Sequence, residues 1–74
     1  MKDIDYFKKF RINLQLLRIS KGYTSIQLSK KIGSSPKRIT DFEYGKHGRG
    51  KPKAEELFKL SKVLGVSPED LIFK

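Results

Sequence analysis

The amino-acid sequence predicts an all-α fold of five helices around one hydrophobic core, in a single domain spanning 1–74. Apolar residues recur at spacings of three and four, as on one face of a helix. Residues that favour helix starts precede these segments, and a glycine follows each of the first four. Because the chain has only 74 residues, its core has to be compact.

The first and longest predicted helix runs from Asp3 to Lys21. An acidic residue, Asp3 or Asp5, complements the helix dipole at its start, and Gly22 ends it. Its apolar residues fall on two opposite sides. The side expected to face the core carries Phe7, Phe10, Leu14 and Leu17.

A second apolar stripe on this helix consists of Ile12, Leu16 and Ile19. In a domain with one core, such a stripe either packs under the C-terminal segment or stays exposed as a contact surface for another protein. The sequence favours neither alternative over the other.

Two short amphipathic helices joined by a glycine turn are predicted between Thr24 and Lys46. Thr24 and Gln27 have the spacing of a capping box, in which each side chain accepts a hydrogen bond from the other residue's backbone amide. The first helix therefore starts at Thr24, and Gly33 supplies the left-handed conformation that ends it. This pattern predicts a helix-turn-helix.

The second helix of the pair is predicted to start at Ser35 and to run to about Tyr44. Serine is a good N-cap, and Pro36 suits the first helical position because its missing amide would have no partner there. Ile39 and Phe42 point inward. The outward face is polar and of mixed charge, and it carries Lys37, Thr40, Asp41 and Tyr44.

Two further helices complete the predicted fold. Ala54 to Leu64 is the fourth, with Gly65 as its cap, and the fifth starts at Ser67 and Pro68. The phenylalanines share helical spacing with leucine and isoleucine, so they are expected in the core rather than stacked on bases. They are Phe7, Phe10, Phe42, Phe58 and Phe73.

The charge balance predicts attraction to polyanions. The chain has 17 Lys and Arg against 8 Asp and Glu, a net charge of +9 and a pI near 10.0. Nucleic acid is the first candidate partner. The densest basic stretch is the loop from Gly45 to Lys53, whose basic residues are Lys46, His47, Arg49, Lys51 and Lys53.

Several classes of protein are disfavoured by composition. The chain has no cysteine and one histidine, which argues against disulfides, thiolate chemistry and a metal site. It lacks a glycine-rich phosphate loop, a histidine paired with a nucleophile and a clustered carboxylate site, so neither an enzyme nor a cofactor is expected. No apolar run has the length of a membrane span, and a cytoplasmic, nucleoid-associated protein of bacterial or phage type is expected.

The chain resembles the lambda-repressor-like, Cro-type or xenobiotic-response-element helix-turn-helix family. That resemblance implies a five-helix domain that binds operator DNA, in most members as a two-fold dimer, and regulates transcription; the helix matching residues 35–44 enters the major groove. The matching residues are Leu17, Arg18, Gly22, Tyr23, Thr24, Gln27, Leu28, Ile32, Gly33, Ser35, Ile39, Phe42, Glu43, Tyr44, Gly45, Lys46, Leu57, Leu60, Leu64, Gly65, Val66, Ser67 and Leu71.

The resemblance also implies roles for individual residues. Arg18 and Glu43 would form a structural ion pair, and Ser25 would contact a phosphate. Pro36, Lys37 and Asp41 match the positions that most often read bases, with Ser35 and Thr40 beside them. Proline cannot read a base edge, however, so the expected readers are Ser35, Lys37, Thr40 and Asp41.

Three other departures from the family pattern are visible. Ser34 replaces an apolar residue, Ile26 replaces a polar one, and the loop between Glu43 and Pro52 is longer than expected. The longer loop leaves open the register of its phosphate contacts. Those contacts are expected from Arg38, Tyr44, Lys46, Arg49, Lys51 and Lys53, in addition to Ser25.

Two alternatives remain at this point. Lys37 and Asp41 could form an i,i+4 ion pair on a solvated face instead of reading guanine and cytosine. The chain as a whole could be a repressor that binds a pseudo-palindromic operator as a homodimer, or a protein-interaction module such as an antitoxin or anti-repressor component. The surface for a protein partner would then be Ile12, Leu16 and Ile19, or the C-terminal Leu71, Ile72 and Phe73.

Overall fold

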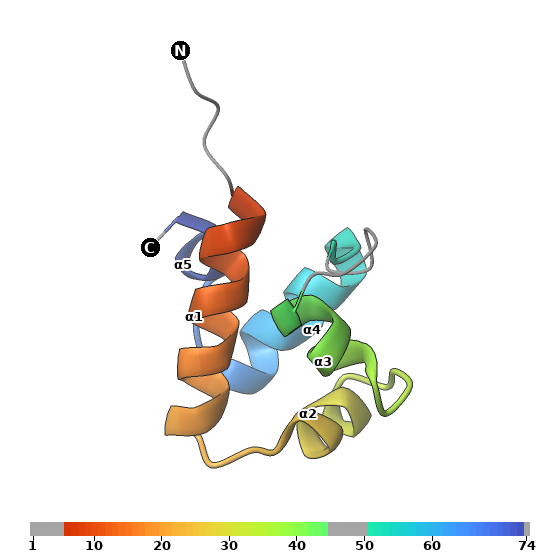
Figure 1. Ribbon diagram of the computed structural model, residues 1–74. Coiled ribbons are helices and arrows are strands. Elements are labelled where there is room, and N and C mark those ends of the chain that lie inside the picture. The colour runs from red at the N-terminus through yellow and green to blue at the C-terminus, as the bar shows by residue number, and fades with distance from the viewer. Residues whose placement is uncertain (1–5, 45–50, 74) are drawn as a thin grey trace.

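The computed structural model describes residues 6–44 and 51–73. These residues contain five α-helices and no strand, so the predicted all-α fold is confirmed (Figure 1). The helices are α1 (Tyr6–Ser20), α2 (Ser25–Lys31), α3 (Arg38–Tyr44), α4 (Ala54–Leu64) and α5 (Pro68–Phe73).

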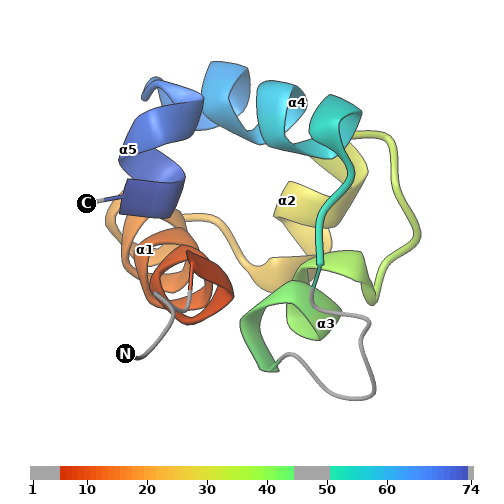
Figure 2. The same ribbon diagram turned by 90° about the horizontal axis from the view of Figure 1, so that it is seen from above.

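The helices surround one apolar interior. α1 lies beside α5 and contacts α3, α3 packs on α2, and α4 leads directly into α5, as the view from above shows (Figure 2). Each helix contributes at least one buried residue, so no helix is peripheral to the core. The fully or nearly fully buried apolar side chains are Phe10, Leu14, Leu28, Ile32, Ile39, Phe42, Leu60, Leu64 and Leu71.

Most helix ends lie where local signals predict them. The capping box is present, since the Gln27 amide donates to Thr24 Oγ1 at 3.1 Å and the Thr24 amide to Gln27 Oε1 at 2.9 Å. After α2 the backbone of Gly33 has a φ of 74°, and the Ser34 amide donates to the Ser29 carbonyl, as in a Schellman turn. The predicted start at Asp3 lies outside the described residues.

The start of α3 differs from the prediction. The helix begins at Arg38, not at Ser35, because the Arg38 amide donates to the Ser35 carbonyl in a three-residue turn. The Arg38 amide is one of the two that a Ser35 side-chain cap could have used. Instead, Ser29 on α2 supplies an acceptor: its Oγ receives the buried Ile39 amide at 3.0 Å and donates to the Ser25 carbonyl.

The prediction that the phenylalanines are buried is wrong for Phe58 and Phe73, which are 64% and 53% exposed. On α4, Leu60 and Leu64 already fill the inward face, and Phe58 lies off that face. Phe10 and Phe42 are buried and meet edge to face at 5.7 Å between ring centroids. The side chain of Phe7 lies outside the described residues.

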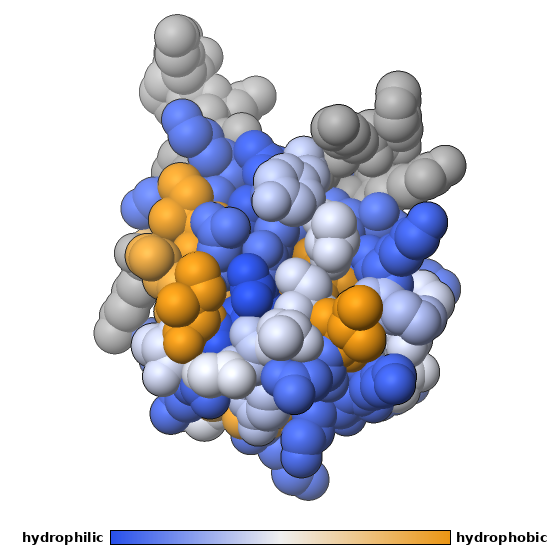
Figure 3. All heavy atoms as spheres, turned by 60° about the horizontal axis from the view of Figure 1, so that its bottom comes forward, coloured by the Kyte–Doolittle hydropathy of each residue, from blue (hydrophilic) through white to orange (hydrophobic). Residues whose placement is uncertain are grey.

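The second apolar stripe of α1 does not pack under the C-terminal segment. Ile12, Leu16 and Ile19 are 49%, 62% and 59% exposed, and we refer to these three residues as the outer stripe. Figure 3 shows hydrophobic side chains gathered on the side of the molecule that α1 occupies. None of the described helices is both long and apolar enough to cross a membrane.

The Ser29 contact generates a prediction about stability. Ser29→Ala leaves the buried Ile39 amide without its acceptor, so the free energy of unfolding should fall by about 1–3 kcal/mol. Urea-induced unfolding monitored by circular dichroism measures this change.

Ser61 provides the matched control, because it is also buried, and its hydroxyl donates to the Leu57 carbonyl of its own helix. Ser61→Ala should therefore cost less than about 1 kcal/mol. Equal losses for the two variants would show that Ser29 contributes by filling space and not by capping α3.

Candidate nucleic-acid interface

The outward side of α3 and of the turn before it is polar. Lys37 and Thr40 are exposed, Tyr44 is 64% exposed and Asp41 is half-buried, while Ile39 and Phe42 on the inner side are fully buried. The Asp41 amide donates to the Lys37 carbonyl, which keeps the two residues one turn apart. Ser35 and Pro36 are also exposed. The structure therefore places the four predicted base-reading residues on the first half of α3 and on the turn before it. They are Ser35, Lys37, Thr40 and Asp41.

The C-terminal end of α3 is held to α1 by an ion pair. Arg18 Nε and Nη2 lie 2.6 and 3.2 Å from the two carboxylate oxygens of Glu43, and Arg18 Nη1 donates to the Tyr23 carbonyl at 2.9 Å. These are the two residues for which the resemblance implies an ion pair. The Glu43 side chain is only 3% exposed, and hydrogen bonding to it raises the pKa of the Arg18 guanidinium. A buried carboxylate is stable here because its charge is paired.

A second ion pair, absent from the sequence analysis, holds the N-terminal end of α3 to α4. Arg38 Nε lies 2.7 Å from Glu56 Oε2, and Arg38 Nη2 lies 2.8 Å from Glu56 Oε1. The Arg38 guanidinium also stacks over the buried Phe42 ring at 4.4 Å. The sequence predicts a phosphate contact for Arg38, whereas in the structure its guanidinium contacts Glu56 and the Phe42 ring, so Arg38 is not among the phosphate contacts proposed below.

Glu56 has a third hydrogen bond in addition to those from Arg38. The Lys53 amide at the start of α4 donates to Glu56 Oε1 at 2.8 Å. The bonds from Arg38, followed by this backbone bond, hold the pKa of the Glu56 carboxyl below its usual value, against the opposing effect of burial. The same hydrogen bonds are the main reason why the pKa of the Arg38 guanidinium is raised.

The other expected phosphate contacts lie on several elements. Lys51 and Lys53 are exposed just before α4, and Tyr44 is exposed at the end of α3. Ser25 is half-buried at the first position of α2. Lys46 and Arg49 lie outside the described residues.

Local signals could have identified only part of this network. Glu56 lies three residues after Lys53, the spacing at which a glutamate accepts from an N-cap amide. Glu55, the residue before it, instead forms an exposed i,i+4 pair with Lys59 at 3.7 Å. Nothing local indicates that Arg38 reaches Glu56 or that Ser29 reaches Ile39.

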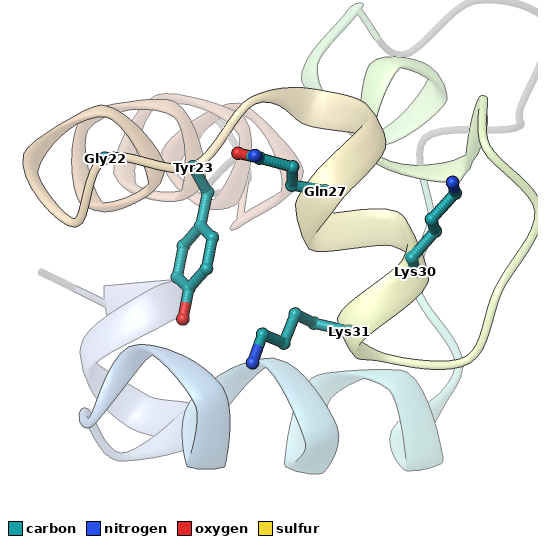
Figure 4. Close-up of a pocket in the computed structure, with 5 residues that line it drawn as sticks. All are labelled: Gly22, Tyr23, Gln27, Lys30 and Lys31. Carbon is teal, nitrogen blue, oxygen red and sulfur yellow. The ribbon is translucent and has the colours of Figure 1, made fainter.

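Shallow, open hollows lie on the described part of the chain. One of them, of about 460 Å³, lies between Tyr23 and α2. Figure 4 shows Tyr23 and Lys31 extending into the same space while Lys30 points away from it. Among the described residues no group of histidine, cysteine or acidic side chains could hold a metal ion.

Comparison with known proteins agrees with this geometry. Residues 14–71 match the protein family described as Helix-turn-helix. Among solved structures, the chain is similar to the crystal structure of a hypothetical transcription factor, NHTF, from Neisseria, with a TM-score of 0.82 and 22% sequence identity over 93% of this chain and 76% of that chain. At this identity the similarity shows the fold alone. No curated protein matches the chain.

The lowered pKa of Glu56 predicts how stability depends on pH. A carboxyl whose pKa is lower in the folded than in the unfolded chain stabilises the fold above its unfolded pKa, near 4.5, and this contribution is lost as the pH falls through the folded pKa. Glu56→Gln should therefore be less stable than the unaltered chain by about 2 kcal/mol at pH 7. The difference should shrink when urea unfolding is repeated from pH 5 downward.

Glu55→Gln is the control for this measurement. The substitution removes the same charge from the neighbouring position, but the Glu55 side chain is 79% exposed, so its cost at pH 7 should stay below about 0.5 kcal/mol. If the gap between Glu56→Gln and the unaltered chain stayed constant from pH 7 to pH 3, the pairing of Glu56 with Arg38 would not be the source of its contribution.

Proposed function

We propose that this chain, which belongs to the lambda-repressor-like helix-turn-helix family, is a sequence-specific repressor. The members of this family are DNA-binding domains that serve in transcription regulation and are not enzymes. In this proposal the chain binds a pseudo-palindromic operator as a homodimer, with one α3 in the major groove of each half-site. The observation that carries the proposal is the exposed polar side of α3, held at both ends by ion pairs.

Direct reading of bases is assigned to Ser35, Lys37, Thr40 and Asp41. A lysine can donate to O6 and N7 of guanine, and an aspartate can accept from N4 of cytosine. Lys37 carries the larger share of this reading, because Pro36 has no donor and Asp41 is repelled by phosphate unless it meets its cytosine. The exposure of Lys37 and Thr40 supports this division.

Affinity is assigned to contacts with the DNA backbone. The net charge of +9 favours association with any duplex, and each neutralised phosphate adds about 0.9 to the slope of log affinity against log salt concentration. The proposed contacts are Ser25 at the start of α2, Tyr44 at the end of α3, and the basic residues Lys46, Arg49, Lys51 and Lys53.

In this proposal the two-fold symmetry of the operator matches that of a dimer. Two copies related by a two-fold axis would place their α3 helices in successive major grooves, about 34 Å apart along the duplex. Repression would then require only that the bound dimer occupy the DNA.

The division between base reading and phosphate contact can be tested with two lysine variants. An operator is first selected from a random oligonucleotide pool with the unaltered chain. Lys37→Ala should lower discrimination at one base pair of each half-site by about 1–3 kcal/mol. Lys53→Ala should weaken binding to every sequence alike and lower the salt slope by about 0.9.

Fluorescence anisotropy with the selected duplex and its single-base variants, at three salt concentrations, measures both quantities. Equal loss of discrimination from the two variants would contradict the assignment of roles. Recovery of no consensus from the pool would contradict sequence-specific binding altogether.

A second function is favoured by the outer stripe of α1. Its three large apolar side chains are exposed on the side of α1 opposite the buried face. They follow one another at spacings of four and three residues, as on one helix of a coiled coil. A docked helix would cover them.

The charge of α1 favours an acidic partner over a second copy. Besides Arg18, which is paired with Glu43, the helix contains Lys8, Lys9 and Arg11 and no Asp or Glu, and each whole chain carries +9. In the absence of DNA, which would neutralise their charge, two copies would repel one another across the outer stripe, whereas an amphipathic helix with glutamates beside its apolar stripe would be attracted. The proposed partner is therefore an acidic amphipathic helix of another protein.

A synthetic peptide provides the test: an amphipathic helix with a leucine stripe flanked by glutamates, and a matched peptide with lysines in their place. The glutamate peptide should bind, and Ile12→Ser combined with Ile19→Ser should weaken binding at least about tenfold through lost apolar contact. Phe58→Ser, which removes an equally exposed apolar side chain from α4, should leave binding unchanged.

Two results would contradict this second function. One is equal binding of the glutamate peptide to the unaltered chain and to the Ile12→Ser, Ile19→Ser variant. The other is sedimentation showing that the unaltered chain forms dimers without DNA and that the double variant does not, since a second copy would then be the occupant of the outer stripe.

A further inference from the structure

One carboxylate joins the two parts of the proposed DNA-binding surface. Glu56 accepts two hydrogen bonds from Arg38, the first residue of α3, and one from the backbone amide of Lys53, at 2.7, 2.8 and 2.8 Å. The first part of the surface contains the base-reading residues of α3 and the turn before it. The second contains Lys51 and Lys53, the described basic residues just before α4.

The Arg38 side of this connection is rigid. Its guanidinium is fixed on one face by the buried Phe42 ring at 4.4 Å and at its edge by both oxygens of Glu56. Two-point contact by a planar guanidinium defines orientation as well as distance, which a single lysine ammonium cannot do. The start of α3, next to Lys37, therefore has a defined position relative to α4.

The Lys53 side of the connection is a main-chain contact. Because the backbone amide is the donor, Glu56 fixes the path of the chain where the basic segment enters α4, whatever the Lys53 side chain contacts. The side chains of Lys51 and Lys53 remain exposed beside it. The Glu56 side chain itself is only 12% exposed, so solvent screens these contacts weakly.

We propose that Glu56 is a positioning residue, which holds the base-reading helix and the phosphate-contacting segment in the register that an operator half-site requires. This inference rests on the proposed function, since it assigns those two roles to the parts that Glu56 joins. Specific binding needs base and phosphate contacts at the same time, and therefore depends on register. Non-specific binding is electrostatic and does not.

The inference predicts effects of opposite sign on the two kinds of binding. Glu56→Gln has nearly the same shape but removes a negative charge next to the DNA surface. Affinity for a shuffled duplex should therefore stay the same or rise, while affinity for the selected operator should fall about tenfold, the effect of one misplaced base contact. A loss of stability alone would lower both affinities by the same factor.

The experiment measures both affinities by fluorescence anisotropy, at a temperature where circular dichroism shows each variant to be folded. Glu55→Gln is the matched control, because it changes the net charge equally at an exposed neighbour outside the connection. It should leave the ratio of operator to shuffled affinity unchanged. A tenfold fall of the ratio for Glu56→Gln alone supports the inference, and an unchanged ratio overturns it.

Arg38→Lys is a second variant that keeps the net charge and leaves the carboxylate with a cationic neighbour. It removes the two-point contact and the stacking on Phe42, so it should lower the operator affinity without lowering the shuffled affinity. A parallel loss of both affinities would assign Arg38 to phosphate contact and overturn the inference. If the unaltered chain selects no consensus, the proposed function fails, whereas a consensus with an unchanged ratio for both variants rejects only the role of Glu56.

Discussion

The position of α3 depends on contacts from other helices, because seven residues are too few to form a stable helix alone. Three side chains supply those contacts. Ser29 of α2 accepts the Ile39 amide, Arg18 of α1 pairs with Glu43, and Glu56 of α4 pairs with Arg38. Two of these contacts hold the start of α3, and the third holds its end. The inner side then needs only Ile39 and Phe42 to fill the core, which leaves the outer side free for polar residues.

The two ion pairs also determine which charges face outward. Glu43 and Arg38 are charged residues of α3 itself, and each is turned inward to a partner of opposite sign on a neighbouring helix. Such pairs add little net stability compared with apolar side chains of the same size, but breaking one leaves an uncompensated charge near the core. Their larger effect is to define a single orientation of the helix, since both arginines bind the carboxylate through two nitrogens.

Features that depend on neighbouring residues could be predicted from the sequence, and features that depend on distant ones could not. The capping box of Thr24 and Gln27, the turn at Gly33 and the bounds of α4 are set within a few residues, and they agree with the prediction. The Arg18 and Glu43 contact spans 25 positions and was indicated only by the family resemblance. Ser29 and Glu56 look like ordinary surface residues in the sequence. Phe58 was misplaced because hydrophobicity does not tell which side of a helix is already full.

The backbone conformation of Gly33, and not the space around it, disfavours other residues at this position. An added Cβ at this position would meet no atom within 4 Å, yet a φ of 74° is one that L-amino acids rarely adopt. A D-amino acid has the opposite preference. D-alanine at residue 33, introduced by chemical synthesis, would therefore prefer the backbone conformation of the turn between α2 and α3. It would also restrict the unfolded chain, which favours the folded turn relative to glycine.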